Sequence, residues 1–238
     1  MNILKNLKQR WPFILAGLLI VVGITLNLYA ASHFLKPNTN PLPPPPPPTA
    51  IQPPNPPETL PPQTEPKYGH FPYPEANQNN LIIISSYAQK QYQRFEKMHT
   101  EAALALMKMI YAARDEGVWI VPVSGFRTIA YQETLFQAQI QRRGSPEEAA
   151  KLSAPAGYSE HHTGYAIDLA DGNFPKQDIT YEFANTNAFR WLNKHAKEYG
   201  FELSFPENNP QGISYEPWHW RFIASPSAAK IFAGAKNP

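Results

Sequence analysis

Apolar residues recur at intervals of three or four along residues 86–116, in a stretch that is otherwise rich in polar side chains. This spacing is typical of an amphipathic helix, because side chains three or four positions apart lie on the same helix face. Gly117 follows the last apolar position and predicts the end of the helix. The apolar positions are Phe95, Met98, Ala102, Leu106, Ile110 and Ala113.

Shorter patterns predict the remaining elements of the C-terminal region. Helices come early and strands late, without the strict alternation of strand and helix that a parallel sheet requires. The sequence therefore favours the α+β class, with a small, mainly antiparallel sheet and flanking helices. The predicted strands are 118–123, 165–169, 201–203 and 218–223, and the other predicted helices are 128–142 and 186–199.

Residues 11–32 form an apolar run without a charged side chain. A helix over this run would be about 33 Å long, which suffices to cross a bilayer core of about 30 Å. Basic residues precede the run, and this bias predicts that residues 1–10 are cytoplasmic and that everything downstream is exported. We expect a single-pass transmembrane anchor over 11–35. A cleaved signal peptide is the alternative, although its apolar core is shorter, about 7–15 residues.

Proline dominates residues 36–74, where the stretches PLPPPPPPTA, PPNPPE and LPPQTEP hold many of the 27 prolines in the chain. Proline lacks an amide donor and has a fixed φ angle, so this tract favours polyproline II over helix or central strand. We expect a semi-rigid spacer between the anchor and a folded domain at 75–238. A ligand for proline-binding partner domains is the alternative interpretation.

Composition narrows the possible chemistry of the domain. The 238-residue chain has no cysteine, so a metal would have to be held by nitrogen and oxygen ligands. Its formal net charge is +2, and it has no concentrated basic excess, so a nucleic-acid partner is not expected. A monomer is expected.

Two polar strings lie in apolar surroundings, SEHHTGYAID at 159–168 and YEPWHWRF at 215–222. Asp168 falls in a predicted strand, and Glu216 and His219 stand among tryptophans, where ionisable groups are costly without partners. A metal would satisfy both strings. Two imidazoles and one carboxylate leave a fourth position of a tetrahedral zinc site open, as in catalytic sites. A further carboxylate would then be free to take a proton from water.

These strings resemble a known family. Ser159-x-His161-x6-Asp168, followed by Glu216-x-x-His219, is similar to the zinc D-alanyl-D-alanine carboxypeptidases of VanY type. That family includes L,D-carboxypeptidases and is related to the VanX-type D,D-dipeptidases. SGFRTIAYQETLF at 124–136 also resembles a family segment, with phenylalanine in place of the usual tyrosine. The resemblance covers about 85–224 and implies a Hedgehog/D,D-peptidase-like fold.

The resemblance also implies roles for individual residues. Glu216 would be the catalytic base and then the acid that protonates the leaving amine. Arg127 would steady the substrate carbonyl or carboxylate, with a structural ion pair as the alternative. Ser159 and Gln132 would line the substrate pocket. The implied zinc ligands are His161, Asp168 and His219.

The other histidines are expected to have lesser roles. His162 follows the implied ligand directly, and is predicted to point elsewhere and to act behind the site or at its rim. His70, His99 and His195 lie outside the motifs and are predicted to be solvated.

The resemblance implies a zinc-dependent D,D-carboxypeptidase that removes the C-terminal D-alanine from peptidoglycan stem peptides, in a periplasmic or extracellular domain held at the cell membrane. Three alternatives remain: an L,D-carboxypeptidase acting on tetrapeptide stems, an endopeptidase that cuts cross-bridges, and a wall-binding module without catalysis. The motifs do not separate the first alternative from the main interpretation. The presence of Glu216 argues against the last, because a binding module would need no base.

Overall fold

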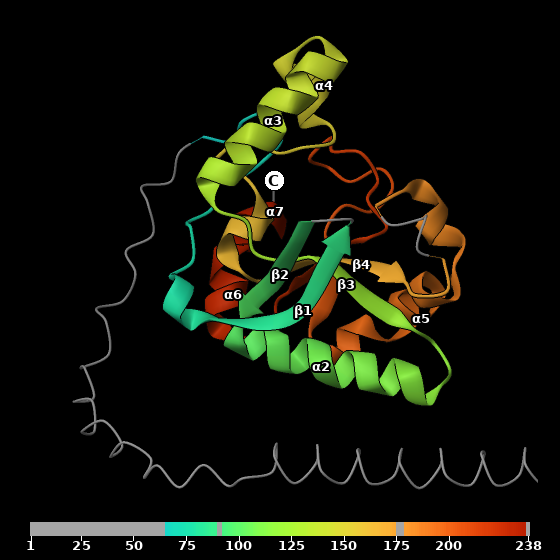
Figure 1. Ribbon diagram of the computed structural model, residues 1–238. Coiled ribbons are helices and arrows are strands. Elements are labelled where there is room, and N and C mark those ends of the chain that lie inside the picture. The colour runs from blue at the N-terminus through green and yellow to red at the C-terminus, as the bar shows by residue number, and fades with distance from the viewer. Residues whose placement is uncertain (1–64, 90–91, 175–178, 237–238) are drawn as a thin grey trace, which may run out of the picture. The chain divides into compact units, whose positions relative to one another are not determined.

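The computed structural model describes residues 65–89, 92–174 and 179–236 (Figure 1). The predicted anchor at 11–35 and most of the predicted linker at 36–74 lie outside these residues. Within the described part of the chain, no helix combines the length and the apolar character needed to cross a membrane. The anchor therefore stays a prediction.

A four-stranded antiparallel sheet forms the centre of the described domain. The order β3-β4-β6-β5 places β4 and β6 side by side in the middle, where every residue of both strands is buried. This sheet with its flanking helices confirms the predicted α+β class. The strands are β3 (Ile120–Ser124), β4 (Ala166–Asp171), β5 (Phe201–Leu203) and β6 (His219–Phe222).

The first half of the predicted helix at 86–116 is wrong. The strands β1 (Leu81–Gln89) and β2 (Tyr92–His99) instead form an antiparallel pair there, and the helix α2 (Thr100–Asp115) begins only after them. Exposure along β2 alternates, since Glu96 and Met98 are buried whereas Phe95 is 57% exposed. This period of two belongs to a strand, and Phe95 and Met98 matched the helical spacing only by coincidence.

The helix predicted at 128–142 is present as α3 (Ile129–Arg143). The Thr128 side chain accepts a hydrogen bond from the Tyr131 amide at its start, and Gly144 ends it in a left-handed conformation. The helix predicted at 186–199 is present as α5 followed by a 3-10 turn. The short helices α4, α6 and α7 were not predicted. The bounds are α4 (Pro146–Ala150), α5 (Asn187–His195), α6 (Pro226–Ile231), α7 (Ala233–Lys236), η1 (Gln78–Asn80), η2 (Glu160–Thr163), η3 (Tyr181–Asn185) and η4 (Ala196–Tyr199).

The hydrophobic core lies between the sheet and the helices α2 and α5 (Figure 1). Ile167 and Leu169 of β4 are fully buried in this core. Because successive side chains of a strand point to opposite faces, Asp168 between them points to the other side of the sheet. The core thus holds β4 so that its one central carboxylate faces away from the apolar side chains.

Residues 67–73, which the sequence assigned to the linker, pack against the domain. Tyr73 belongs to the core, and its amide donates a hydrogen bond to the Gly157 carbonyl at 2.9 Å. His70 is only 5% exposed, and its Nε2 lies 2.8 Å from the Ala150 carbonyl oxygen. The predicted domain start at 75 is therefore too late, and the prediction that His70 is solvated is wrong. Aromatic side chains between the prolines supply the apolar surface that docks this segment.

Candidate metal centre and active site

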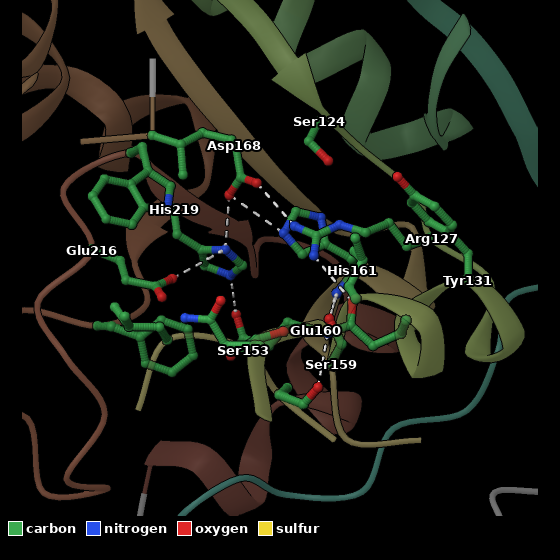
Figure 2. A pocket seen from close by; sticks show the side chains of 18 of the residues that line it. Ser124, Arg127, Tyr131, Ser153, Ser159, Glu160, His161, Asp168, Glu216 and His219 are labelled. Carbon is green, nitrogen blue, oxygen red and sulfur yellow. Dashed lines mark hydrogen bonds and ion pairs between the residues drawn. The ribbon is translucent and has the colours of Figure 1, made fainter. Parts of the chain in front are cut away.

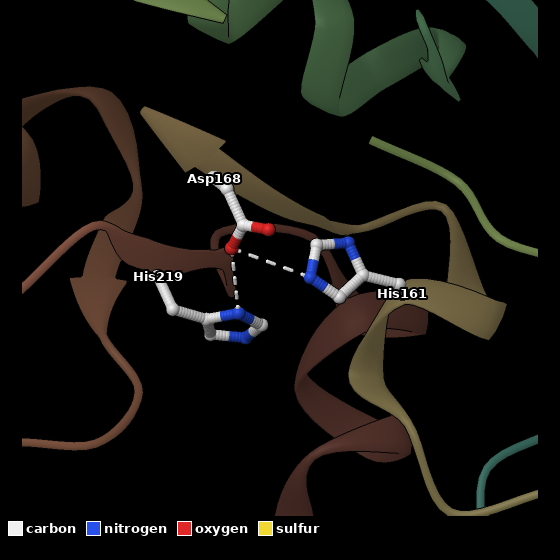
Figure 3. A group of neighbouring side chains, drawn as sticks. All are labelled: His161, Asp168 and His219. Atoms are coloured by element: carbon white, nitrogen blue, oxygen red, sulfur yellow. Dashed lines mark hydrogen bonds and ion pairs between the residues drawn. The ribbon is translucent and has the colours of Figure 1, made fainter. Parts of the chain in front are cut away.

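Three polar side chains from separate elements converge beside the sheet (Figure 3). One potential ligand atom from each of His161, Asp168 and His219 lies within 4.8 Å of the other two. The Oδ1 atom of Asp168 is 3.3 Å from Nε2 of His161 and 3.0 Å from Nδ1 of His219. All three residues are buried. The structure thus brings together the residues that the sequence predicted as metal ligands.

Local backbone structure explains why these side chains meet. The antiparallel register of β4 and β6 pairs Asp168 directly with His219. His161 lies in the 3-10 turn η2, which ends at Gly164 with a φ of 70°. This left-handed conformation favours glycine, and a Cβ atom at Gly164 would also lie only 3.2 Å from the His99 amide nitrogen.

A backbone carbonyl determines the tautomer of His161. Its Nδ1 lies 2.7 Å from the Gly125 oxygen, which can only accept, so Nδ1 carries the proton. The opposite nitrogen, Nε2, is buried and has no hydrogen-bond partner among the described residues. Burial and the nearby Arg127 charge lower the pKa of His161 to about 4, which keeps the ring neutral at pH 7. An unpartnered imidazole lone pair facing a carboxylate fits a bound cation.

Carboxylates contact both ring nitrogens of His219. Nδ1 lies 3.0 Å from Asp168 and Nε2 lies 2.9 Å from the Glu160 Oε2 atom. Burial alone would lower the pKa of His219, but these hydrogen bonds raise it to about 10. Burial would raise the pKa of Asp168, but His161, His219 and Arg127 hold it well below its usual range. In the metal-free site, His219 is therefore protonated. A divalent cation that binds between His219 and Asp168 would displace the proton from the imidazole.

Glu216 lies next to these three residues without being one of the converging ligands. Its Oε2 atom is 3.9 Å from Nδ1 of His219. Burial raises the pKa of Glu216 to about 8, the nearby His219 opposes this rise, and Asp168 adds to it. A buried carboxylate with a pKa near neutrality, at the edge of a metal site, can take up and release a proton.

Arg127 and Gln132 form the wall of the site beside Asp168. One guanidinium nitrogen of Arg127, Nη2, lies 3.0 Å from the Asp168 Oδ2 atom, and Nη1 donates to the Gln132 Oε1 atom at 3.1 Å. The Gln132 amide nitrogen donates to Ser153 and to the Ala154 carbonyl. The side chain of Gln132 therefore makes its hydrogen bonds within the protein and holds Arg127 in place. Arg127 also forms an ion pair with Asp168, which was the alternative role predicted for it.

Ser159 and His162 make hydrogen bonds to the backbone on either side of the site, at His161 and Arg127. The Ser159 hydroxyl lines the cavity and accepts a hydrogen bond from the His161 amide at 3.4 Å. His162 is fully buried; its Nδ1 lies 2.8 Å from the Arg127 carbonyl, and its Nε2 accepts from the Gly157 amide. His162 thus points away from the ligands, as its position one residue after His161 predicted, and it holds the Arg127 backbone.

A cavity of about 390 Å³ opens beside the converging side chains (Figure 2). Its inner end is formed by the three ligand residues, Glu216 and Arg127, all labelled in Figure 2. Its outer part follows one side of α3. A chain end could enter along α3 and reach the metal position. The residues of α3 on this side are Tyr131, Gln132, Leu135, Gln139 and Arg142.

Sequence reasoning missed Glu160, Ser204 and Arg221, which surround the far side of His219. Glu160 lies between two motif residues and is only 3% exposed. The signal was present, since Arg221 falls in a predicted strand between Trp220 and Phe222, where an unpaired charge is unfavourable. The partner of this arginine could not be chosen from the sequence, because it lies 61 residues away.

The site combines two imidazoles and a carboxylate beside a cavity, with a further buried carboxylate next to them. This arrangement is typical of a mononuclear metal-dependent hydrolase. Residues 95–225 match the family described as VanY: D-alanyl-D-alanine carboxypeptidase. The chain therefore belongs to the VanY family, which confirms the resemblance seen in its motifs.

Individual relatives agree with this assignment. The chain is 32% identical over 148 residues to the YodJ protein of Bacillus subtilis (strain 168), covering 61% of this chain and 52% of YodJ. It is 29% identical over 154 residues to a D-alanyl-D-alanine carboxypeptidase of Enterococcus faecalis (strain ATCC 700802 / V583), covering 60% of this chain and 54% of that protein. The chain thus spans about half the length of these curated relatives.

A solved structure, that of the LdcB LD-carboxypeptidase, matches with a TM-score of 0.55 and 30% identity. The match covers 65% of this chain and 73% of that chain.

Proposed function

We propose that this protein is a zinc-dependent carboxypeptidase that hydrolyses the bond before the C-terminal D-alanine of peptidoglycan stem peptides. The observation that carries the proposal is the convergence of three ligand atoms beside Glu216 at the inner end of the cavity. Membership of the VanY family supplies the substrate class. The D-alanyl-D-alanine carboxypeptidase of Enterococcus faecalis supports the D,D specificity.

Zinc suits the donor set of the chain. His161 Nε2, His219 Nδ1 and one Asp168 oxygen would hold the ion, which leaves a fourth position facing the cavity. The unpartnered Nε2 of His161 fits this assignment, because a buried lone pair without a donor is otherwise unfavourable. When bound, zinc supplies Lewis-acid polarisation of the scissile carbonyl and acidifies water at its open position.

Glu216 would transfer the proton of the reaction. Its carboxylate would accept a proton from the attacking water, whose oxygen forms the new bond to the carbonyl carbon. The same carboxyl group would then give the proton to the amine nitrogen of the departing D-alanine as the carbon–nitrogen bond breaks. The position of Glu216, whose Oε2 atom is 3.9 Å from Nδ1 of His219, supports this role.

Arg127 would stabilise negative charge on the substrate. Its guanidinium lines the cavity and keeps its charge at any physiological pH. The contact with Gln132 would hold it in place as negative charge develops on the carbonyl oxygen or as the terminal carboxylate binds. Ser159 and Gln132 would complete the pocket wall, mainly by positioning their neighbours.

L,D-carboxypeptidase activity on tetrapeptide stems is the second candidate. It is favoured by the match to the solved LdcB LD-carboxypeptidase, which has 30% identity and a TM-score of 0.55. Endopeptidase action on cross-bridges and wall binding without catalysis follow it. These activities differ in their products, so one set of substrates separates them.

The experiment incubates the full chain, purified in detergent and loaded with zinc, with pentapeptide stems, tetrapeptide stems and cross-linked dimers, and reads the products by mass spectrometry. Loss of one D-alanine from the pentapeptide is expected, and Glu216→Gln should abolish it while retaining zinc. Release from the tetrapeptide alone would assign L,D specificity, and monomers from dimers would assign an endopeptidase. Intact peptides with zinc-loaded wild-type protein would overturn the proposal.

We also propose that residues 11–35 anchor the protein in the cell membrane, with residues 1–10 in the cytoplasm, and that the proline-rich segment carries the domain to the wall. The apolar run and its basic flank support this topology. In intact cells, an externally added protease should remove the domain, and alkaline washing of membranes should leave the chain bound. Release of a shortened chain would indicate a cleaved signal peptide.

A further inference from the structure

We propose that Glu160 is a positioning residue of the metal centre, whose carboxylate holds His219 in the tautomer and orientation that metal binding requires. This inference rests on the proposed function in one respect, that His219 binds a divalent cation. Glu160 itself is not one of the converging ligands and is placed beyond the far side of the His219 ring from Asp168.

Four donors surround the Glu160 carboxylate, which is only 3% exposed. Its Oε2 atom lies 2.9 Å from Nε2 of His219 and accepts a hydrogen bond from the Ser204 hydroxyl at 2.6 Å. Its Oε1 atom accepts from Nη1 of Arg221 at 2.7 Å and from the Tyr73 hydroxyl at 3.5 Å. Both oxygens are therefore occupied, and the carboxylate has little freedom to rotate.

Arg221 supplies the charge that makes this buried carboxylate tolerable. Its Nη1 contacts Glu160, its Nε donates to the Glu202 Oε1 atom at 2.8 Å, and its guanidinium lies 5.3 Å from the centre of the Phe232 ring. An isolated buried carboxylate would be strongly unfavourable, whereas one paired with a buried, hydrogen-bonded arginine is not. The negative charge of Glu160 behind His219 is thus stabilised by a second buried charged residue, Arg221.

The chemistry of imidazole connects this charge to the metal. A carboxylate can only accept, so its contact with Nε2 requires the proton of the neutral ring to be on Nε2. The lone pair of the neutral ring then lies on Nδ1, which is the atom 3.0 Å from Asp168 and facing His161. A carboxylate behind a ligating histidine also increases the basicity of the ligand nitrogen.

Strand geometry makes Glu160 the link between the two motifs. Arg221 lies two residues after His219 in β6, so both side chains are on the same face of the sheet. Glu160 directly precedes His161 in η2. One side chain therefore connects the turn that carries the first ligand to the strand that carries the last, and a shift of either element would disturb the ligand geometry.

The zinc dissociation constant of the full chain tests the inference, measured by competition with a chelator for wild type, Glu160→Gln and the control Glu202→Gln. Glu202 contacts Arg221 on its other side and, among the contacts described, does not contact His219. Glu160→Gln should weaken zinc binding by about 10–100-fold, the range for removing such a supporting carboxylate. Glu202→Gln should leave zinc binding unchanged.

Equal zinc affinity in wild type and Glu160→Gln would overturn the inference, as would an equal loss in both variants. The wild-type protein provides a second measurement that does not depend on a variant folding. In zinc-loaded wild type, nitrogen NMR should show the His219 proton on Nε2 and zinc on Nδ1, and the reverse assignment would also overturn it. A wild type that binds zinc but releases no D-alanine would contradict the proposed function and leave the role of Glu160 intact.

Discussion

The two ends of the cavity are built differently. At the inner end, His161, Asp168 and His219 are buried, and a second layer of protein atoms holds each of them. At the outer end, the side chains of α3 other than buried Gln132 are more exposed: Tyr131 is 46% exposed, and Arg142 donates a hydrogen bond to Gln139 of the same helix. The groups that need a fixed geometry thus lie on the sheet and in the buried segments beside it, and the more exposed contacts lie on the helix.

This contrast predicts that the effects of substitution decline from the inner end to the outer end. A rigid, dehydrated group contributes its full interaction to the reaction, whereas an exposed side chain is replaced by water when it is removed. The experiments below follow that order.

Removal of the metal should have the largest effect. Dialysis of the purified chain against a chelator should abolish hydrolysis, because the inner end then retains no Lewis acid. Addition of one equivalent of zinc should restore the rate, as measured by D-alanine release. His161→Ala should not be restored in this way at the same zinc concentration. Full activity of the zinc-free chain would contradict the assignment of the three ligands.

Glu216→Gln should lower kcat by about 10²–10⁴-fold, the contribution expected from a general base. The amide keeps the size of the side chain but cannot accept the proton. Zinc content should be unchanged, because Glu216 is not among the three converging ligands. Elemental analysis and steady-state kinetics on the same preparation check both points. Loss of zinc together with loss of activity would instead indicate that Glu216 binds the metal.

Arg127→Lys should lower kcat/KM by about 10²-fold, the scale of removing one donor to a developing oxyanion. Lysine keeps the charge but cannot contact Asp168 and Gln132 at the same time, as the planar guanidinium does. Arg142→Lys at the outer end is the matched control. An equal loss of activity in both variants would contradict this prediction, because it would show that the fixed position of Arg127 does not contribute to catalysis.

The pH dependence of stability isolates Glu216 in the metal-free protein. Its pKa is raised to about 8, so between about pH 4.5 and pH 8 the folded chain retains a proton that the unfolded chain has lost. Glu216 therefore makes the free energy of unfolding fall as pH rises through this window, whereas His161, with its pKa lowered to about 4, contributes a rise between about pH 4 and pH 6.5. His219, with a pKa raised to about 10, contributes a fall of the same sign from about pH 6.5 upward.

Glu216→Gln should remove the first of these contributions, on the order of 3 kcal/mol between pH 5 and pH 8. Urea unfolding of the metal-free wild type and variant at the two pH values measures the difference. A variant whose stability changes with pH over this range as the wild type's does would contradict the elevated pKa of Glu216.

Arg142→Ala at the outer end should have the smallest effect. Its side chain is exposed, so we expect a change in KM of about 2-fold, or ~0.5 kcal/mol, and no change in kcat. The same kinetic assay on the pentapeptide stem measures it. A large fall in kcat would show that the two ends of the cavity do not differ as their burial indicates.

The residues of the site were predictable because the motifs name them. The spacing around His161, Asp168, Glu216 and His219 identified a metal site and the VanY family before any fold was known. The partners of those residues were not predictable. Glu160 has its contacts with Ser204, His219 and Arg221 across separations of 44, 59 and 61 residues. No local pattern specifies which distant groups will be neighbours.

By itself the sequence determined the α+β class, the four strands of the central sheet, α3 and the residue types at the metal centre, because each leaves a periodic or motif signal within a short window. Only the tertiary structure decided that β1 pairs with β2, that 67–73 pack against the domain, and that Glu160 stands behind His219. In each case the deciding free energy comes from burial and pairing with segments distant in the chain, and local spacing does not report such contacts.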